Sequence, residues 1–366
     1  MVASDGTQRV HLSSMKQPHH LCALVSGMTA VLIAMATVTA SEPPLKWEKL
    51  PALSDAEGFA SMYSGVSHGV LLAAGGANFP GKRPWEGGTK VWYDTVWTLN
   101  QPEGTWQKAG QLPQPLGYGA SVTWKDEVIC AGGSHSTGHV ADAFALRLDQ
   151  GKLVTRPLPK LPKPCANMSW ALVNEVLYIS GGIDRPDATS AMATLWALRL
   201  SDVAATWQEL PQCPGTPRML AVAGSWEGAF YLFGGAGLQA GPDGKASRIW
   251  LKDAWRYTPN SGWEKLPDLP RVVVAAPSPT PSIAEGLLIA SGDDGSKVGF
   301  KPETDHPGFP KSGLLFAPRT GTWLELASVP FSLATAPVTP WQGGWVIPSG
   351  EARPGYRTPQ VWFMKR

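Results

Sequence analysis

Six short apolar runs, each ending in a Gly-Gly or Ser-Gly pair, recur along the chain and constrain its fold more than any other feature. The second residue of the pair stands at positions 76, 133, 182, 235, 292 and 350, so successive units are 57, 49, 53, 57 and 58 residues apart. A second apolar run with a Trp or Phe follows each pair, as in DTVWTL and TLWALRL. Most units then contain a third run with the pattern Trp-x-(Lys/Glu)-Leu-Pro or a variant of it. Self-similarity at such a period predicts that each unit is one module of a repeat architecture.

Each module has the sequence of four short strands: one before the Gly pair, one that runs into it, one with the aromatic run and one with the Trp-x-x-Leu pattern. Four-stranded units of this length are typical of the blades of a β-propeller, and the Gly pair with its following aromatic residue resembles the kelch repeat. The 17 Trp residues have a structural explanation in this fold, because Trp packs between neighbouring blades. The sequence therefore predicts an all-β, six-bladed kelch-type β-propeller.

The sixth unit lacks one strand, because the chain ends directly after VWFMKR. The segment LKWEKLPAL at residues 45–53 has the signature of an outermost strand, yet it precedes the first complete unit. We expect this N-terminal strand to pair with the C-terminal blade and to close the ring, which removes the exposed sheet edges. One propeller domain is thus predicted over residues 42–366.

The first 40 residues have the pattern of a secretory signal peptide. Lys16 precedes the apolar stretch HLCALVSGMTAVLIAMATVTA, which ends in small residues at Ala40. An uncleaved membrane anchor is the alternative, since the stretch approaches membrane-spanning length. We therefore expect a signal peptide over residues 1–40 and a periplasmic or secreted mature protein with no membrane association.

Charge and cysteine content restrict the possible partners. Only 16% of the residues are charged and the formal net charge is +2, so the chain lacks the basic surface that nucleic acid requires. Cys130, Cys165 and Cys213 have no CxxC spacing, which allows at most one disulfide and suggests no metal or catalytic role. The two His residues in HSTGH, at residues 135–139, lack an obvious carboxylate partner and are interpreted as part of a polar turn. We expect no metal and no other cofactor.

Three loops that follow a Gly or Ser-Gly pair are long or rich in charge, at residues 75–94, 291–313 and 350–358. Loops alternate between the two faces of a propeller, so these three open on the same face around the central channel. The third, GEARPGYRT, holds Glu351, Arg353 and Arg357. A solvated surface salt bridge is the simplest interpretation of these charges. The stiff Pro354-Gly355 bend and the low charge of the chain favour a shared pocket instead.

At this point the sequence resembles a known family. GEARPGYRT and GGANFPG, together with the six kelch-like units, resemble motifs of the bacterial sialic acid mutarotases, or N-acetylneuraminate epimerases. In this chain GGANFPG lies in the first blade and GEARPGYRT in the last, so the resemblance is to a cyclically permuted branch of that family. It implies an exported isomerase that interconverts the α and β anomers of free N-acetylneuraminate or a related acidic sugar.

The resemblance also implies roles for five residues. Glu351 matches the proposed general acid/base, which would move protons as the hemiketal opens and recloses. Arg357 matches the arginine that holds the sugar carboxylate, a task suited to a planar guanidinium. Arg353 occupies another basic position, while Arg218 and Asn78 lie in matched stretches and are expected to bind substrate.

Other functions are weighed against this one. A sialidase would need a Tyr nucleophile with an arginine triad, and a copper radical oxidase would need paired Tyr and His ligands; neither set can be assembled from this sequence. The main alternative is an exported kelch propeller that is not an enzyme and binds a glycan or a protein partner. The Glu/Arg loop favours the enzyme, because a protein-binding surface does not require it.

Overall fold

The computed structural model describes residues 45–365, which belong to a unit spanning Glu42–Arg366. The predicted signal peptide at residues 1–40 lies outside the described residues. Among the residues that are described, no helix has the length and apolar character needed to cross a bilayer.

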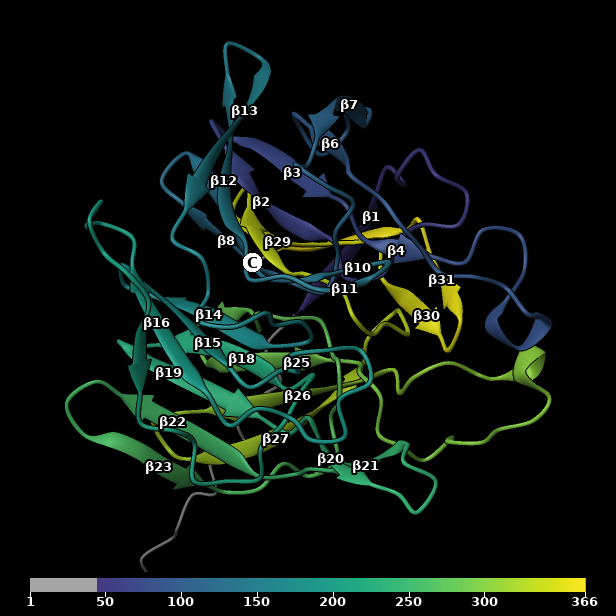
Figure 1. The fold of residues 1–366 in the computed structure, drawn as a ribbon, viewed down its shortest axis with the longest axis vertical. Coiled ribbons are helices and arrows are strands. Elements are labelled where there is room, and N and C mark those ends of the chain that lie inside the picture. The colour runs from purple at the N-terminus through teal and green to yellow at the C-terminus, as the bar shows by residue number, and fades with distance from the viewer. Residues whose placement is uncertain (1–44, 366) are drawn as a thin grey trace, which may run out of the picture. The chain divides into compact units, whose positions relative to one another are not determined.

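Six antiparallel four-stranded sheets surround a central channel, as the sequence predicts (Figure 1). We number them as blades, each given from its innermost to its outermost strand. Blade 1 contains β2 (Tyr63–Ser67), β3 (Val70–Ala74), β6 (Thr95–Leu99) and β7 (Gln107–Gln111). Blade 2 contains β8 (Ala120–Trp124), β9 (Glu127–Ala131), β12 (Ala143–Asp149) and β13 (Lys152–Leu158). Blade 3 contains β14 (Ser169–Val173), β15 (Val176–Ser180), β16 (Leu195–Arg199) and β17 (Gln208–Leu210).

The remaining blades follow the same order. Blade 4 contains β18 (Val222–Trp226), β19 (Ala229–Phe233), β22 (Ala254–Thr258) and β23 (Gly262–Leu266). Blade 5 contains β24 (Ser282–Ile283), β25 (Gly286–Ala290), β26 (Ser312–Ala317) and β27 (Thr322–Ser328). Blade 6 contains β28 (Thr339–Trp341), β29 (Gly344–Pro348), β32 (Val361–Lys365) and β1 (Lys46–Leu50).

Short elements occupy the loops that follow the Gly and Ser-Gly pairs. Four two-stranded hairpins are β4 (Ala77–Asn78) with β5 (Val91–Trp92), β10 (Ser134–His135) with β11 (Gly138–His139), β20 (Ala236–Ala240) with β21 (Ala246–Trp250), and β30 (Glu351–Arg353) with β31 (Tyr356–Arg357). Two 3₁₀ helices are η1 (Pro84–Glu86) and η2 (Glu303–Asp305).

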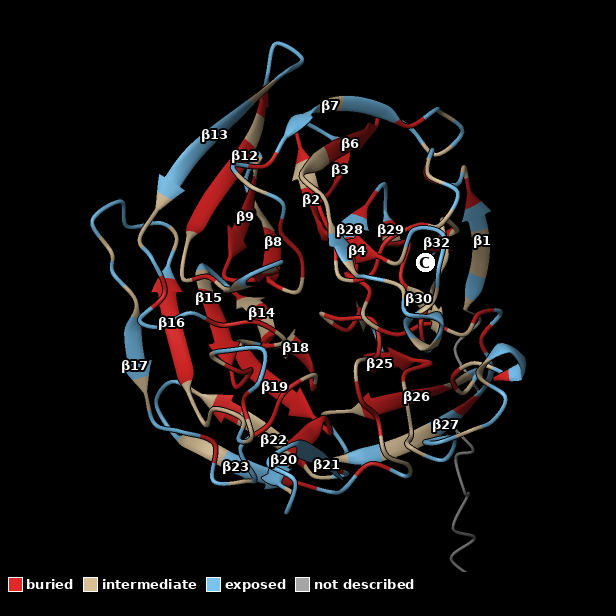
Figure 2. Ribbon diagram, turned by 45° about the vertical axis from the view of Figure 1, so that its right-hand side comes forward, coloured by how far each residue is buried: buried red, intermediate tan, exposed pale blue. Residues whose placement is uncertain are grey.

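Burial follows the position of a strand within its blade (Figure 2). Every residue of β19, with the sequence AFYLF, is buried, because both faces of this strand pack against a neighbouring blade. The outermost β7 is mostly exposed and has the polar sequence QKAGQ. The second strand of each module therefore has an apolar sequence, as expected for a strand covered on both faces.

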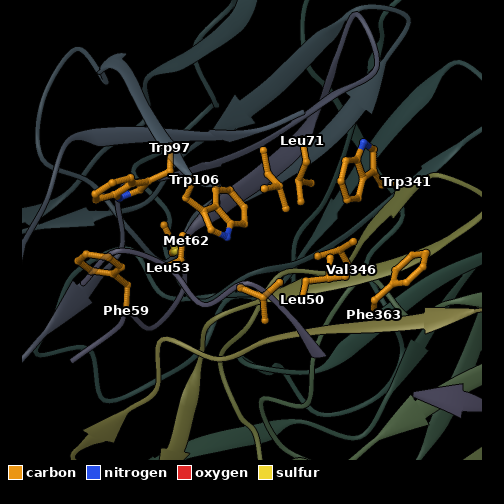
Figure 3. Packing of buried hydrophobic residues seen from close by; sticks show 13 residues of the cluster. Leu50, Leu53, Phe59, Met62, Leu71, Trp97, Trp106, Trp341, Val346 and Phe363 are labelled. Carbon is orange, nitrogen blue, oxygen red and sulfur yellow. The ribbon is translucent and has the colours of Figure 1, made fainter. Parts of the chain in front are cut away.

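The ring is closed in the way predicted from the sequence. β1 pairs with β32 in antiparallel register from Lys46 opposite Lys365 to Leu50 opposite Val361. Behind this pair, an apolar cluster joins blades 6 and 1 (Figure 3). It combines Leu50 from the N-terminal strand and Phe363 from the last strand with Leu71 of blade 1. Burying apolar area from both ends of the chain stabilises the closed ring.

A ring of backbone hydrogen bonds encircles the channel. One residue per blade, just before the innermost strand, donates its N–H to the carbonyl of the equivalent residue in the preceding blade, over 2.6–3.0 Å. All six have a left-handed backbone conformation with φ between 49° and 65°. These axial-ring residues are Ser61, Tyr118, Asn167, Leu220, Ala275 and Thr335.

The Gly and Ser-Gly pairs join each blade to the next. The N–H of the second residue donates to a carbonyl at the head of the following blade's innermost strand, as Gly76 does to Leu116 over 2.7 Å. A Cβ placed on Gly75 would stand 2.2 Å from that same carbonyl oxygen, and Gly75 has a φ of 63°. Glycine is therefore required here by space and by backbone conformation. In blades 5 and 6 Ser replaces the first glycine, and the hydroxyl of Ser349 bonds to the backbone of Phe59.

Tryptophans of the outermost strands connect neighbouring blades. In four blades the indole N–H donates to the carbonyl of the Pro that follows the outermost strand of the preceding blade, over 2.7–3.0 Å. The pairs are Trp106 with Pro51, Trp207 with Pro159, Trp263 with Pro211, and Trp323 with Pro267. This contact accounts for the Trp and the Pro of the repeated pattern.

The three cysteines at positions 130, 165 and 213 are free and buried, so none of them forms the single disulfide that the sequence allowed. Burial raises the pKa of the Cys130 and Cys165 thiols far above the ordinary value.

Candidate active site

The GEARPGYRT segment forms the hairpin β30–β31 at one end of the channel (Figure 1). Arg353 pairs with Tyr356 across a two-residue turn made of Pro354 and Gly355, whose φ is 77°. Pro followed by Gly is the sequence preference of a turn that needs a positive φ at its second central position. The N–H of Gly355 donates to Oε1 of Glu351 over 2.9 Å. The turn thus helps to hold the carboxylate in place.

Glu351 and Arg357 form an ion pair in which Arg357 Nη1 lies 2.6 Å from Glu351 Oε1. The Arg357 side chain is 4% exposed and that of Glu351 is 19% exposed. The guanidinium also donates to the Ala77 carbonyl over 3.4 Å and to the Tyr118 hydroxyl over 3.5 Å. Burial alone would lower the pKa of Arg357, but Glu351 and Tyr118 outweigh it and raise the pKa. The pair is a fixed feature and not a loose surface contact.

Lys90 is a second cation at this site, and the sequence did not single it out. Its Nζ lies 4.9 Å from the ring centre of Tyr118, 5.5 Å from that of Trp92 and 5.7 Å from that of Phe79. Phe79 is also covered by the Arg357 guanidinium, 5.0 Å away. None of the ion pairs formed within residues 45–365 includes Lys90. Lys90 therefore adds a cation without a carboxylate partner, among the described residues, to the Glu351–Arg357 pair.

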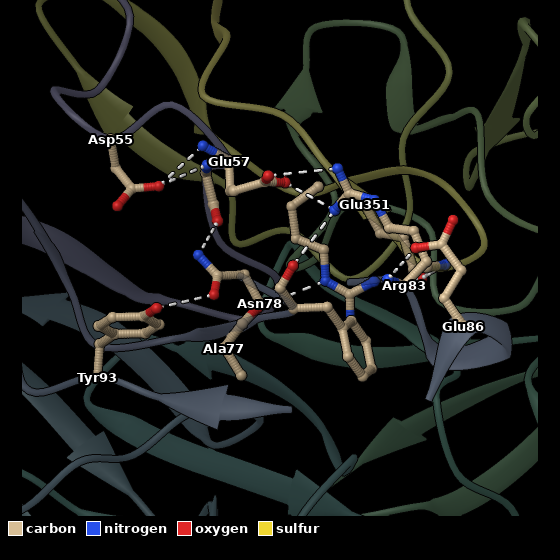
Figure 4. A network of polar contacts seen from close by, with 12 residues as sticks. Asp55, Glu57, Ala77, Asn78, Arg83, Glu86, Tyr93 and Glu351 are labelled. Carbon is tan, nitrogen blue, oxygen red and sulfur yellow. Dashed lines mark hydrogen bonds and ion pairs between the residues drawn. The ribbon is translucent and has the colours of Figure 1, made fainter. Parts of the chain in front are cut away.

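Arg353 connects the hairpin β30–β31 to the blade 5 loop. Its guanidinium donates to the Thr304 carbonyl in the blade 5 loop over 2.7 Å and lies 3.9 Å from the ring centre of Tyr356. Arg83 from the blade 1 loop lies 4.4 Å from the same ring and pairs with Glu57 over 2.7 Å (Figure 4). The three long loops therefore meet through Arg353, Tyr356 and Arg83. The predicted contact of Arg353 with substrate stays a prediction.

Asn78 and Arg218 are both buried, and each has partners inside the protein. The Asn78 amide donates to the Gly58 carbonyl over 2.9 Å and accepts the Tyr93 hydroxyl over 2.9 Å (Figure 4). Arg218 makes two hydrogen bonds to Asp253, over 2.7 and 2.6 Å. Burial would raise the pKa of Asp253, but Arg218 holds it below its ordinary value. These contacts give both residues a structural role, and their predicted substrate contacts stay predictions.

The channel beside the ion pair contains a cavity lined by axial-ring residues, including Tyr118, Asn167 and Thr335. Tyr118 belongs to both features, since its hydroxyl is bonded to Arg357. Thr335 Oγ1 is buried and has no hydrogen-bond partner in the described part of the chain. The cavity thus offers polar groups next to the Glu351–Arg357 pair.

The described residues contain no group of three or more His, Cys, Asp or Glu side chains that could hold a metal ion. His135 and His139 lie on the hairpin β10–β11, and burial lowers the pKa of His139.

Fold and site together define a kelch-type propeller with a partly buried carboxylate–guanidinium pair at the mouth of its channel. The family model for N-acetylneuraminate epimerase matches residues 23–155 and 158–290, and the chain belongs to this family. The family resemblance inferred from the motifs is therefore confirmed.

Relatives and a solved structure agree with this assignment. The chain is 40% identical over 116 residues to the N-acetylneuraminate epimerase of Salmonella enteritidis PT4, an alignment that covers 29% of this chain and 30% of that protein. It is 41% identical over 127 residues to the enzyme of that name from Yersinia enterocolitica serotype O:8, covering 30% and 31%. The chain thus aligns with less than a third of the length of these relatives. The structure described as "Structure of YjhT" superposes with a TM-score of 0.61 at 14% identity over 86% of this chain and 96% of that one, which supports the fold.

Proposed function

We propose that this protein is an isomerase that interconverts the α and β anomers of free N-acetylneuraminate or a closely related acidic sugar. The observation that carries the proposal is the Glu351–Arg357 pair at the channel mouth with Lys90 beside it, which forms no ion pair within residues 45–365. Family membership supports the choice of substrate. Export to the periplasm or medium belongs to the same proposal and rests on the apolar stretch near the N-terminus.

The chemistry needs a proton acceptor at the anomeric hydroxyl. Opening the hemiketal removes that proton and delivers one to the ring oxygen, and closure on the opposite face reverses both transfers. Glu351 is the carboxylate placed for this task, because it is partly exposed at the mouth and its orientation is fixed by Arg357 and by the N–H of Gly355. A positioned carboxylate contributes about 10²–10⁴-fold to such a proton transfer.

The substrate carboxylate sits on the anomeric carbon and needs a cation close to Glu351. Arg357 is nearly buried, and its guanidinium already bonds to Glu351, Tyr118 and Ala77. Lys90 has no carboxylate partner within residues 45–365, so its ammonium group is free to bind an anion. We therefore assign the carboxylate to Lys90, with the charge of the nearby Arg357 adding to the attraction. The motif resemblance implied that Arg357 alone holds the substrate carboxylate, whereas this proposal includes Lys90 as well.

The test follows both anomers by proton NMR after crystalline N-acetylneuraminate is dissolved. The wild-type protein should speed the approach to equilibrium and leave the final ratio unchanged. Glu351→Gln should lose this acceleration and still bind the sugar in calorimetry. Glu103→Gln, an exposed carboxylate in another loop, should behave like the wild type.

Binding of a glycan or a protein partner remains the second candidate, because kelch propellers commonly present loops for recognition. Sugar binding by the wild type without faster anomer exchange would favour that function. Full activity of the Glu351→Gln variant would remove Glu351 from the mechanism.

A further inference from the structure

The residue after each Gly or Ser-Gly pair occupies an equivalent position in all six blades. Each one bridges, by antiparallel backbone pairing, to the residue just before the axial-ring residue of its own blade. The six residues are Ala77, Ser134, Ile183, Ala236, Asp293 and Glu351. Only the last two are charged, and they belong to the adjacent blades 5 and 6. The repeat therefore places a second carboxylate beside the one assigned to catalysis.

The Asp293 carboxylate is held in a defined setting. Its side chain is 23% exposed, and Oδ1 accepts the N–H of Gly295 over 2.9 Å. Arg248 Nη1, from β21, is 4.0 Å from Oδ2. Asp293 lines a cavity between the blade 5 loop and Pro354 of the GEARPGYRT turn. The cavity therefore adjoins the hairpin that carries Glu351.

The electrostatic surroundings of the two carboxylates differ. Glu351 is paired with the guanidinium of Arg357. Asp293 has a raised pKa, mainly because it is buried; Asp294 and Glu351 raise it further, while Gly295 and Arg248 act in the opposite direction. The same cavity is lined by Lys297, Lys301, Glu303 and His306. Asp293 and Glu351 occupy equivalent backbone positions in adjacent blades, so both carboxyl groups lie at the same end of the channel. Carboxyl groups in contrasting environments commonly divide the acid and base roles of a reaction.

We propose that Asp293 is a second catalytic residue, which exchanges a proton with the ring oxygen of the sugar while Glu351 exchanges one with the anomeric hydroxyl. This inference rests on the proposed function and assigns the acid that the mechanism requires.

The two steps balance. In opening, the Glu351 carboxylate takes the proton of the anomeric hydroxyl, a carbonyl forms at that carbon, and the bond to the ring oxygen breaks. The electron pair of that bond goes to the ring oxygen, which takes the proton of the Asp293 carboxylic acid. After rotation about the bond next to the carbonyl, Asp293 takes the proton back as the oxygen attacks the other face. Protonated Glu351 returns its proton to the carbonyl oxygen, so both groups regain their starting states.

A binding role for Asp293 is the competing possibility, since a carboxylate can accept hydrogen bonds from the hydroxyl groups of the sugar tail. The two roles predict different kinetics. A proton-transfer group affects kcat, whereas a tail-binding group affects KM and has no effect on a sugar that lacks the tail hydroxyls.

The experiment measures anomer exchange by NMR for wild type, Asp293→Asn and the control Asp305→Asn, an exposed carboxylate of the same loop. Asp293→Asn should lower kcat about 10²–10⁴-fold, the range for loss of general acid–base catalysis, with little change in KM. Asp305→Asn should remain near wild type. The loss should be equal for N-acetylneuraminate and for a six-carbon 3-deoxy-2-ulosonic acid, whose pyranose ring carries no hydroxylated tail.

The pH profile supplies a readout that a structural role would not change. The wild-type rate should fall as the pH rises through the raised pKa of Asp293, because the carboxylic acid is lost. The pH profile of the residual activity of Asp293→Asn should lack this decrease. Thermal unfolding of each variant shows whether the fold is intact.

The experiment distinguishes failure of the proposed function from failure of the Asp293 inference. If the wild type does not accelerate exchange, the proposed function fails and this inference fails with it. If the wild type is active and Asp293→Asn keeps its kcat, or raises only the KM for the longer sugar, this inference alone is overturned.

Discussion

The ammonium group of Lys90 is surrounded by the rings of Phe79, Trp92 and Tyr118. Aromatic faces attract a cation but accept no conventional hydrogen bonds from it, so its N–H groups can still donate to an anion. Lys90→Met keeps the length of the side chain and removes its charge. We expect this variant to raise KM for the acidic sugar about 10–100-fold, because a hydrogen bond to a charged group contributes about 1.5–3 kcal/mol. Steady-state kinetics of anomer exchange measures the effect.

Lys82 provides the matched control, since it is an exposed lysine of the same loop. Lys82→Met should leave KM unchanged at physiological salt. Equal effects of the two substitutions would mean that the general charge of the loop, and not a specific contact, attracts the substrate.

At the residue scale the sequence predicted some features of the site and missed others. Glu351 and Arg357 could be placed together because they are close in sequence and separated by a Pro-Gly turn. Lys90 could not be recognised, because Phe79 and Trp92 stand 13 residues apart in the blade 1 loop and Tyr118 belongs to the next blade. Asp253, the partly buried partner of Arg218, is 35 residues away in the chain, so no local sequence pattern could indicate that pair.

At the scale of elements, the contact from Trp to Pro connects the outer edges of the blades. Trp106 is buried and donates to the Pro51 carbonyl over 2.8 Å, which joins blade 1 to the strand β1. Trp106→Phe keeps a ring but removes the donor. We expect it to destabilise the protein by about 1–3 kcal/mol, the cost of leaving a buried polar group without its partner. Chemical denaturation with a fixed m-value measures this difference.

Trp47 is the appropriate comparison. It is also an outermost-strand Trp, it packs edge-on against Phe331, and its indole N–H makes no hydrogen bond within residues 45–365. Trp47→Phe should therefore cost less than Trp106→Phe. If both cost the same, ring size and not the hydrogen bond determines the stabilisation.

The repeat spacing predicted four strands per blade, and the structure confirms them. The spacing could not predict the hairpins after the Gly pairs, because most of their strands have only two or three residues and leave no periodic pattern in the sequence. Nor could it show that the indole donates to a proline carbonyl, since that contact joins modules about fifty residues apart.

For the whole molecule, closure by the N-terminal strand makes stability depend on the first described residues. A chain that begins at residue 42 retains β1, and a chain that begins at residue 52 lacks it. We expect the shorter chain to unfold at a markedly lower temperature, because it loses the five-residue pairing with β32 and the Pro51 acceptor. Calorimetry of both chains tests this. Equal unfolding temperatures would show that the ring is stable with blade 6 one strand short.

The family and the six-bladed fold could be predicted from motifs and spacing, since both repeat along the chain. Side-chain partners across the channel depend on distances between blades, and a one-dimensional pattern does not contain them.

The axial ring also has an electrical consequence. Its six N–H groups and six carbonyls point head to tail around the channel, so their peptide dipoles form a closed circuit. Dipoles in such a circuit cancel, unlike those of a helix, which add along its axis. The ring therefore makes no net dipole in its own plane. Ionised side chains of the loops contribute full charges at the channel mouth, so the potential that the proposed acidic sugar would meet can be altered one loop at a time while the ring remains unchanged.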